Sequence, residues 1–102
     1  MKTKLKISEI QILPVKPQDG LVAFASCLFE ESLALNSIAI YTRLDGSGYR
    51  LVYPNKILAN GKEISLFYPI NKEIGEALEE AIISKFEELQ EKVKKRNENS
   101  FE

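Results

Sequence analysis

The apolar residues follow two different patterns along the chain. Up to about residue 70 they alternate with polar residues or form short runs of β-branched and aromatic side chains, whereas after Asn71 they recur every three or four residues. Alternation is typical of strands, and three- and four-residue spacing is typical of an amphipathic helix. The sequence therefore predicts a β-rich first part followed by one C-terminal helix.

Turn-forming residues divide the first part into five expected strands. Pro14, Pro17, Asp19 and Gly20 interrupt the pattern after the first strand, and Asp45-Gly46-Ser47-Gly48 and Asn60-Gly61 are typical of hairpin turns. Strands joined by such short turns are antiparallel. The expected strands are Ile7–Leu13 (with a phase slip near Ser8-Glu9 that indicates a bulge), Leu21–Glu30, Leu33–Leu44, Tyr49–Tyr53 and Ile64–Tyr68.

The second expected strand, Leu21–Glu30, has apolar residues on both of its faces. Val22, Phe24 and Leu28 lie on one face, and Ala23, Ala25, Cys27 and Phe29 lie on the other. A strand of this kind belongs in the middle of a sheet that is covered, at least partly, on both sides.

A long amphipathic helix is expected from Lys72 to Arg96, with Asn71 as its N-cap. It would be about 38 Å long, whereas a compact domain of this size has a diameter of roughly 33 Å. Its last turns therefore overhang the body, fray or pack on a second subunit. Val93 continues the apolar face of the helix, which favours packing. The predicted fold is α+β, an antiparallel sheet of about five strands packed against this helix. Residues 1–97 form one domain, and residues 98–102 are expected to form a disordered tail.

Composition excludes several kinds of chemistry. The chain has 102 residues, no histidine and one cysteine, which excludes Ser-His-Asp and Cys-His catalysis and zinc sites built on these ligands. Cys27 lies in the most apolar strand and is expected in the core. Glutamate pairs such as Glu76–Glu80 and Glu87–Glu91 are better explained as a solvated helix face than as a metal site. We expect no enzymatic activity, no metal and no cofactor.

No segment resembles a membrane anchor. Residues 1–6 are basic, but Glu9 and Gln11 interrupt the region where a signal peptide would be apolar. The most apolar stretch, Leu21–Phe29, has nine residues, whereas a spanning helix needs about twenty. We expect a soluble cytoplasmic protein with no membrane partner.

The net charge of −1 conceals an uneven distribution. Residues 73–91 contain seven acids and one lysine, so this segment carries −6 and the rest of the chain +5. Basic residues on neighbouring hairpin strands, with Tyr49, Tyr53 and Tyr68 nearby, could gather at one end of the sheet and bind nucleic-acid backbones and bases. Ordinary solubilising charge explains them as well. The candidate residues on these strands are Arg43, Arg50, Lys56 and Lys62.

A second group of cations closes the helix, and it comprises Lys92, Lys94, Lys95 and Arg96. Cations are favourable at any helix C-terminus because of the helix dipole. A basic tip that binds nucleic acid explains them equally well.

Residues 53–71, Tyr-Pro-Asn-Lys-Ile-Leu-Ala-Asn-Gly-Lys-Glu-Ile-Ser-Leu-Phe-Tyr-Pro-Ile-Asn, resemble the signature of the SpoVG (stage V sporulation protein G) family of septation regulators. In that family a strand ends in Pro-Ser-Lys-Arg, a turn carries Asp-Gly, and His-Pro-Ile-Asn leads into the last helix. Residues 7–10, 21–26 and 35–40 are similar to its first three strands. The resemblance covers roughly residues 5–90.

The resemblance implies a small bacterial regulator that forms homodimers, influences septation or sporulation, and binds DNA or RNA. Lys56 matches the family's lysine, and Lys62 follows the turn. Ile57 replaces the family's arginine, Asn60 its aspartate and Tyr68 its histidine. Because isoleucine cannot contact a phosphate as a guanidinium does, nucleic-acid binding is expected to be weaker or differently placed here.

Two functional hypotheses follow. The first is a non-enzymatic homodimeric regulator of septation, sporulation or gene expression that binds DNA or RNA backbones through the two groups of cations. The second is a protein–protein adaptor of the division machinery, without nucleic-acid binding, that uses an open sheet edge or the acidic helix face. The expected partners are a second copy of the chain, DNA or RNA under the first hypothesis, and division proteins under the second.

Overall fold

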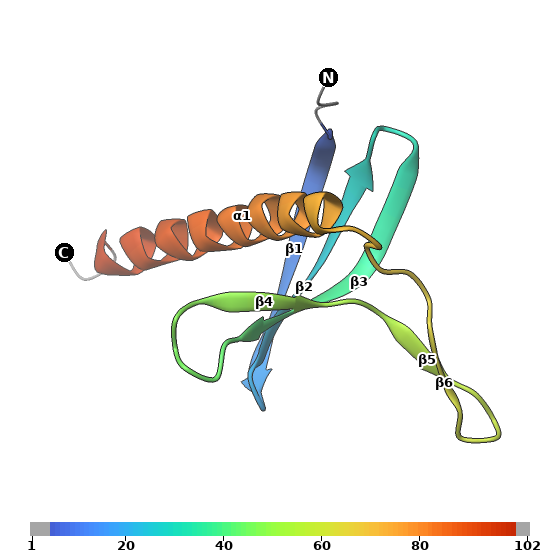
Figure 1. The fold of residues 1–102 in the computed structure, drawn as a ribbon. Helices are drawn as coiled ribbons and strands as arrows, with labels where there is room; N and C mark the ends of the chain where they lie inside the picture. Colours follow the sequence, from blue (N-terminus) through green and yellow to red (C-terminus); the bar gives the residue numbers. More distant parts are fainter. Residues whose placement is uncertain (1–4, 100–102) are drawn as a thin grey trace.

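The computed structural model describes residues 5–99, with side chains described as far as residue 94. Over these residues it contains six strands and one C-terminal helix (Figure 1). The α+β class with an antiparallel sheet and a long final helix is confirmed. The elements are β1 (Ile7–Gln18), β2 (Leu21–Phe29), β3 (Leu33–Thr42), β4 (Tyr49–Val52), β5 (Asn55–Ile57), β6 (Glu63–Ser65) and α1 (Lys72–Asn99).

The strands form two separate sheets. β1 to β4 make one antiparallel sheet in which each strand pairs with the next, and β5 and β6 make a two-stranded sheet of their own. The Asp19-Gly20 turn between β1 and β2 has φ of 52° and 91°, which suits a two-residue hairpin turn of the right twist. Pro54 lacks a backbone N–H group and lies where β4 has ended, so the chain leaves the main sheet there.

β1 is longer than expected, because it continues through Pro14 and Pro17 to Gln18. It lies at the edge of the sheet, where a residue without an N–H group need not break a ladder of hydrogen bonds. The predicted bulge is confirmed, since the register between β1 and β2 shifts between Ser8 and Gln11 and Glu9 has φ of 49°.

The helix α1 begins as expected and extends slightly further. The backbone N–H of Ile74 donates to Asn71 Oδ1 at 2.9 Å, so Asn71 is the N-cap. The helix ends at Asn99 rather than Arg96. Residues 98 and 99, which the sequence assigned to a disordered tail, therefore belong to the helix, and residues 100–102 lie outside the described part of the chain.

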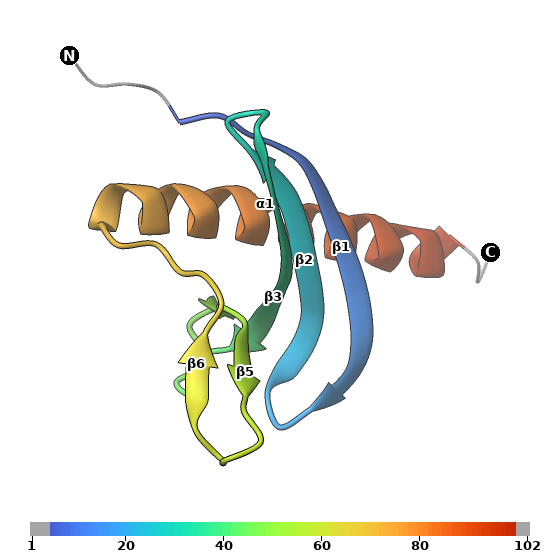
Figure 2. The same cartoon turned by 90° about the vertical axis from the view of Figure 1, so that its right-hand side faces the viewer.

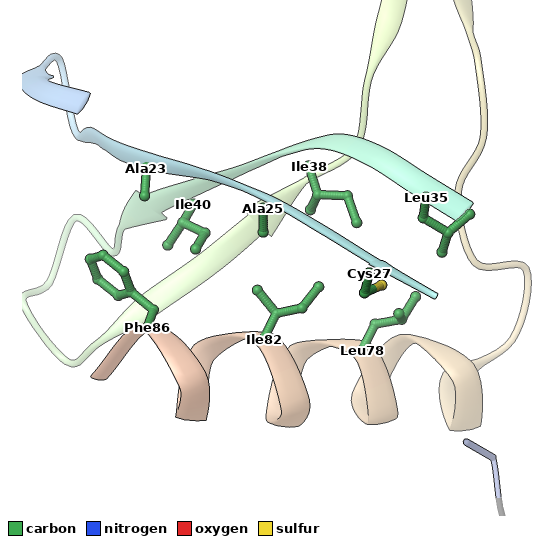
Figure 3. Close-up of a cluster of buried hydrophobic side chains, with 9 residues drawn as sticks. All are labelled: Ala23, Ala25, Cys27, Leu35, Ile38, Ile40, Leu78, Ile82 and Phe86. Atoms are coloured by element: carbon green, nitrogen blue, oxygen red, sulfur yellow. The ribbon is translucent and has the colours of Figure 1, made fainter. Parts of the chain in front are cut away.

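The core lies between α1 and one face of the four-stranded sheet. Figure 3 shows three side chains of the helix pointing toward side chains of β2 and β3. Ile38, Ile40 and Ile82 are fully buried, and Cys27 is buried as expected. Burial raises the pKa of the Cys27 thiol. The cluster comprises Ala23, Ala25, Cys27, Leu35, Ile38, Ile40, Leu78, Ile82 and Phe86.

The other face of the sheet carries a second apolar row. Cross-strand pairs connect Leu13 with Phe24, Phe24 with Ala39, and Ala39 with Val52. Cross-strand partners share a face of the sheet, and successive residues of a strand point to opposite faces. Ala23 and Ile40, which are next to Phe24 and Ala39, point to the helix. The four paired residues therefore face away from it, and they are Leu13, Phe24, Ala39 and Val52. We call this row the open face. Figures 1 and 2 show the helix on one side of the sheet only.

The described fold is open in shape. β5, the following turn and β6 project from the main sheet as an arm, residues 55–65 (Figures 1 and 2). The radius of gyration is 15.7 Å, compared with about 13 Å for a compact chain of this length. The long helix and the arm account for this extension.

Candidate nucleic-acid interface

The predicted cations lie in three separate places rather than at one end of the sheet. Arg43 and Arg50 flank the β3–β4 turn, Lys56 and Lys62 lie on the arm, and the remaining cations lie near the end of α1. Figure 1 shows the β3–β4 turn on the left of the molecule and the arm at the lower right. The expectation that strand pairing gathers the first four is wrong, because β5 and β6 do not join the sheet of β1–β4.

Arg43 attaches the β3–β4 turn to the helix. Its Nη2 donates to Glu79 Oε1 at 3.3 Å. Within the turn, Asp45 Oδ1 accepts hydrogen bonds from the backbone N–H of Ser47 at 2.9 Å and from its hydroxyl at 2.7 Å. These bonds, with a smaller contribution from the charge of Arg43, lower the pKa of the Asp45 carboxyl. Glu79 therefore compensates part of the charge of Arg43.

Arg50 lies on the open face and is exposed to solvent. It pairs across the strands with Tyr41, and its guanidinium carbon lies 5.0 Å from the centre of the Tyr41 ring. A cation over an aromatic face is held by the ring's quadrupole and keeps its charge. Tyr41 was missed as a site residue, although its position two residues before Arg43 on an alternating strand was visible in the sequence.

Of the three tyrosines expected to stack on bases, two are half-buried and pack against the core instead. Tyr49 packs edge-on against Phe86 with ring centres 5.0 Å apart, and its hydroxyl donates to Gln90 Oε1 at 3.1 Å. Tyr53 packs edge-on against Phe67 at 6.1 Å. Burial, and then the charge of Glu79, raises the pKa of Tyr53 to about 12. Only Tyr68 of the three is exposed.

The arm presents Lys56 and Lys62 to solvent. Among the side chains described, residues 5–94, no carboxylate lies within 4.0 Å of either ammonium group. Lys56 pairs with Ile64, whereas Glu63 pairs with Ile57 on the opposite face of the arm, where its carboxylate accepts a hydrogen bond from Asn55. The nearest acid in the arm is therefore turned away from Lys56.

At the end of the helix, Lys92 and Lys94 are exposed. Lys92 Nζ lies 3.6 Å from Glu88 Oε1, one turn earlier. Such an exposed i,i+4 pair is weak, but it lowers the charge that Lys92 can offer. The side chains of Lys95 and Arg96 lie outside the described residues.

Exposed apolar residues that the sequence analysis did not single out begin on the arm and continue beyond its end. Ile64, Leu66, Tyr68 and Ile70 are between 42% and 85% exposed, and we call them the stripe. The alternate residue Phe67 packs against the core. The alternation from Ile64 to Tyr68 was the available signal, and it was interpreted as a fifth strand, whereas β6 spans only Glu63–Ser65.

Neither a metal site nor a membrane helix is found in the described part of the chain. No three Cys, Asp or Glu side chains between residues 5 and 94 are grouped so as to hold a metal ion. No helix within residues 5–99 is both long and apolar enough to cross a membrane.

Comparison with known proteins identifies the family. The sequence model of the SpoVG family matches residues 5–88. This chain belongs to the SpoVG family. The match covers β1 to β6 and most of α1, so it includes the arm and the β3–β4 turn.

Curated relatives agree with this assignment. A SpoVG relative from Treponema denticola is 25% identical over 83 residues, which cover 81% of this chain and 87% of the relative. One from Staphylococcus saprophyticus is 22% identical and covers 94% of this chain and 93% of the relative. One from Phytoplasma australiense is 23% identical and covers 83% of this chain and 86% of the relative. Each is named "Putative septation protein SpoVG".

Proposed function

We propose that this SpoVG-family chain is a non-enzymatic, homodimeric regulator that acts in the cytoplasm. It binds DNA or RNA backbones and thereby influences septation, sporulation or gene expression. One observation carries the proposal. Arg50, Lys56 and Lys62 are exposed, and none has a carboxylate within 4.0 Å among the side chains of residues 5–94. The names of the curated relatives support a role in septation.

Charge neutralisation is the proposed mechanism of binding. Phosphates attract the three exposed cations, and binding releases counterions from the nucleic acid. Arg43 and Lys92 contribute less, because Glu79 and Glu88 compensate them. Lys94, Lys95 and Arg96 supply a second contact at the helix end. Backbone contacts of this kind give little discrimination between base sequences.

Fluorescence anisotropy with labelled duplex DNA and single-stranded RNA at several salt concentrations tests the proposal. For the variant Lys56→Ala/Lys62→Ala, we expect weaker binding and a shallower dependence of log affinity on log salt, by about 0.9 per lost phosphate contact on duplex DNA. The matched control is Lys72→Ala/Lys85→Ala, because both of these lysines are paired with helix glutamates. The control should bind like the wild type.

Two results contradict nucleic-acid binding by this mechanism. One is the absence of binding at low salt, and the other is an affinity that does not change between low and high salt. Equal losses of nucleic-acid affinity in the arm variant and in the control variant would show that the arm is not part of the interface.

The alternative function, an adaptor for division proteins, is favoured by the acidic helix face. Glu76, Glu79, Glu80 and Glu87 line a groove of about 390 Å³ between α1 and the β3–β4 turn, and a basic segment of a partner would fit it. Charge reversal at Glu79, Glu80, Glu87 and Glu88 should then abolish the effect of the protein on septation. Lys94→Ala/Lys95→Ala should leave that effect intact, whereas the regulator hypothesis expects the reverse.

A further inference from the structure

A small apolar pocket lies where the chain returns from the arm to the helix. Its volume is about 270 Å³, and its walls come from the end of β2, the start of β3, the residues after β6 and the first turns of α1. Leu35 and Leu78 are buried in these walls, whereas Leu33, Tyr68 and Ile70 are between 56% and 85% exposed. Every residue that lines the pocket is apolar or aromatic. The pocket therefore favours an apolar occupant.

The size of the pocket favours a side chain over a small-molecule ligand. Small-molecule sites occupy roughly 300–1,000 Å³, whereas a cavity of roughly 150 Å³ lined by aliphatic and aromatic side chains already holds benzene. At about 270 Å³, the pocket accommodates one large apolar side chain and is too small for most cofactors. An apolar residue of a partner protein is the occupant that fits.

The pocket adjoins an unpaired strand edge. Figures 1 and 2 show β6 continuing into the chain that leads to the start of α1. The N–H of Leu66 donates to the carbonyl of Pro54 at 3.0 Å, and hydrogen-bonded pairs alternate along an antiparallel ladder. The backbone groups of Ile64 therefore face β5, and those of Glu63 and Ser65 point to the outer edge of β6. Within residues 5–99 this edge pairs with no other strand.

The isolated arm has reason to accept a third strand. A two-stranded hairpin by itself is marginally stable, and three strands with an apolar face are more stable. A segment that pairs with β6 would cover Ile64 and Leu66 of the stripe, which are 42% and 56% exposed. Addition of a strand to a free edge is a common mode of peptide recognition.

The lysines of the arm specify the charge of the added segment. Lys56 is opposite Ile64, and Lys62 precedes Ile64 by two residues, so both lysines share its face of the arm. Neither ammonium group has a carboxylate within 4.0 Å among the side chains of residues 5–94. Glu63 lies on the opposite face, where it binds Asn55. Acidic side chains therefore complement the face that carries the stripe.

The same lysines discriminate against a second arm as the added strand. Lysine on an edge strand discourages pairing between copies of a protein, because like charges on paired strands repel each other. An acidic segment is attracted instead. Charge complementarity therefore selects an acidic partner over another copy of this chain.

We propose that the outer edge of β6 and the adjoining pocket form a docking site for an extended, acidic segment of a partner protein. The segment pairs with the backbone groups of Glu63 and Ser65 and inserts one apolar side chain into the pocket beside Ile70. Its acidic side chains lie near Lys56 and Lys62. This site is separate from the acidic groove beside α1, and the inference goes beyond nucleic-acid binding.

The geometry also gives the spacing within the partner segment. Lys62 and Ile70 are eight residues apart, which corresponds to at most roughly 26 Å of extended chain. An extended partner that lies alongside therefore has its acidic residues roughly six to eight positions from its apolar anchor. Because Lys56 and Lys62 are also proposed to contact phosphates, the segment and nucleic acid would compete for the arm.

Selection from a phage library of random 12-residue peptides on the immobilised full chain identifies what the site accepts. The Ile70→Asp variant is the bait for counter-selection, because Ile70 is 85% exposed and the folded chain tolerates the change. We expect the enriched peptides to combine one Phe, Leu, Ile or Met with at least two acidic residues, at the spacing given above.

Fluorescence anisotropy with one enriched, fluorescein-labelled peptide tests each part of the site. Lys56→Glu/Lys62→Glu reverses the charge of the arm, Ser65→Pro removes an N–H group from the outer edge of β6, and Ile70→Asp places a charge at the pocket. We expect each variant to raise the Kd roughly tenfold. The control, Lys16→Glu/Lys85→Glu, changes the net charge equally on β1 and α1 and should leave the Kd unchanged. Circular dichroism verifies the fold of every variant.

The possible failures are distinguishable. The inference is overturned if no peptide is enriched over the Ile70→Asp bait, if the enriched peptides lack acidic residues, or if any of the three variants binds like the wild type. If a second copy of the chain covers this surface instead, no peptide will be enriched and sedimentation equilibrium will show a dimer that Ile70→Asp separates. Binding of duplex DNA is measured separately, so its absence would refute the nucleic-acid proposal and leave this docking site standing.

Discussion

Replacing Ile82 with alanine tests the account of the core most directly. Ile82 is fully buried in the middle of α1, and Figure 3 shows it pointing toward β2 and β3 between Leu78 and Phe86. The substitution removes three carbon atoms from the centre of the cluster. Because the facing residues include Ala23 and Ala25, whose side chains cannot extend, the cavity will persist.

The size of the effect follows from this geometry. Burying alanine in place of isoleucine costs 2–5 kcal/mol, and sites that cannot collapse lie in the upper half of that range. The higher helix propensity of alanine returns only a few tenths of a kcal/mol. We expect a loss of about 4 kcal/mol in the free energy of unfolding, a large share of the 5–15 kcal/mol of a typical domain.

Urea unfolding followed by far-UV circular dichroism measures the loss, with both proteins at one concentration because association would add to apparent stability. Val93→Ala is the control. Val93 is 55% exposed on the same helix, so we expect a change of about 0.5 kcal/mol or less. A loss below about 1.5 kcal/mol for Ile82→Ala, at an unchanged m value, would refute the packing described for α1.

Two further predictions concern the helix start and the half-buried Tyr53. Asn71→Ala should cost about 1 kcal/mol of stability, because the N–H of Ile74 loses its acceptor, whereas Asn71→Asp should retain most of it, as urea unfolding will measure. The pKa of Tyr53 is about 12 in the folded chain and about 10 when unfolded. The unfolded state therefore loses the Tyr53 proton first, so this residue lowers stability progressively as pH rises from 10 to 12. Tyr53→Phe should lack that part of the alkaline loss, and it should lack the latest phase of the ultraviolet titration of tyrosine. An alkaline profile identical to that of the wild type would contradict the burial of this hydroxyl.

Local sequence signals predicted most elements because local physics decides them. Asn71 caps the helix, Asp19-Gly20 adopts positive φ, and the phase slip at Glu9 is a bulge. Pro14 and Pro17 were misleading. From sequence alone a proline predicts the end of a strand, although an edge strand can contain one. Whether a strand lies at the edge depends on the order of all the strands in the sheet.

The candidate site was predicted less well because it depends on where segments lie relative to one another. Lys56 and Lys62 are exposed as expected, but they lie on an arm, and no local pattern distinguishes an arm from a fifth strand of the sheet. Tyr49, Tyr53 and Tyr68 look alike in the sequence, because each is a tyrosine near basic residues. Tyr49 nevertheless packs on Phe86, and Tyr53 packs on Phe67. Whether an aromatic ring is a contact surface or part of the core is decided by tertiary packing.

The edges of the four-stranded sheet limit how the protein can aggregate. Along β1, a bulge at Glu9 and prolines at positions 14 and 17 interrupt the outer edge, and β4 offers only four residues before Pro54. Such edges are poor templates for an incoming strand, which is how natural sheets avoid open-ended, fibril-like growth. At high concentration this chain is therefore protected from polymerising through its backbone, even though its apolar side chains remain exposed.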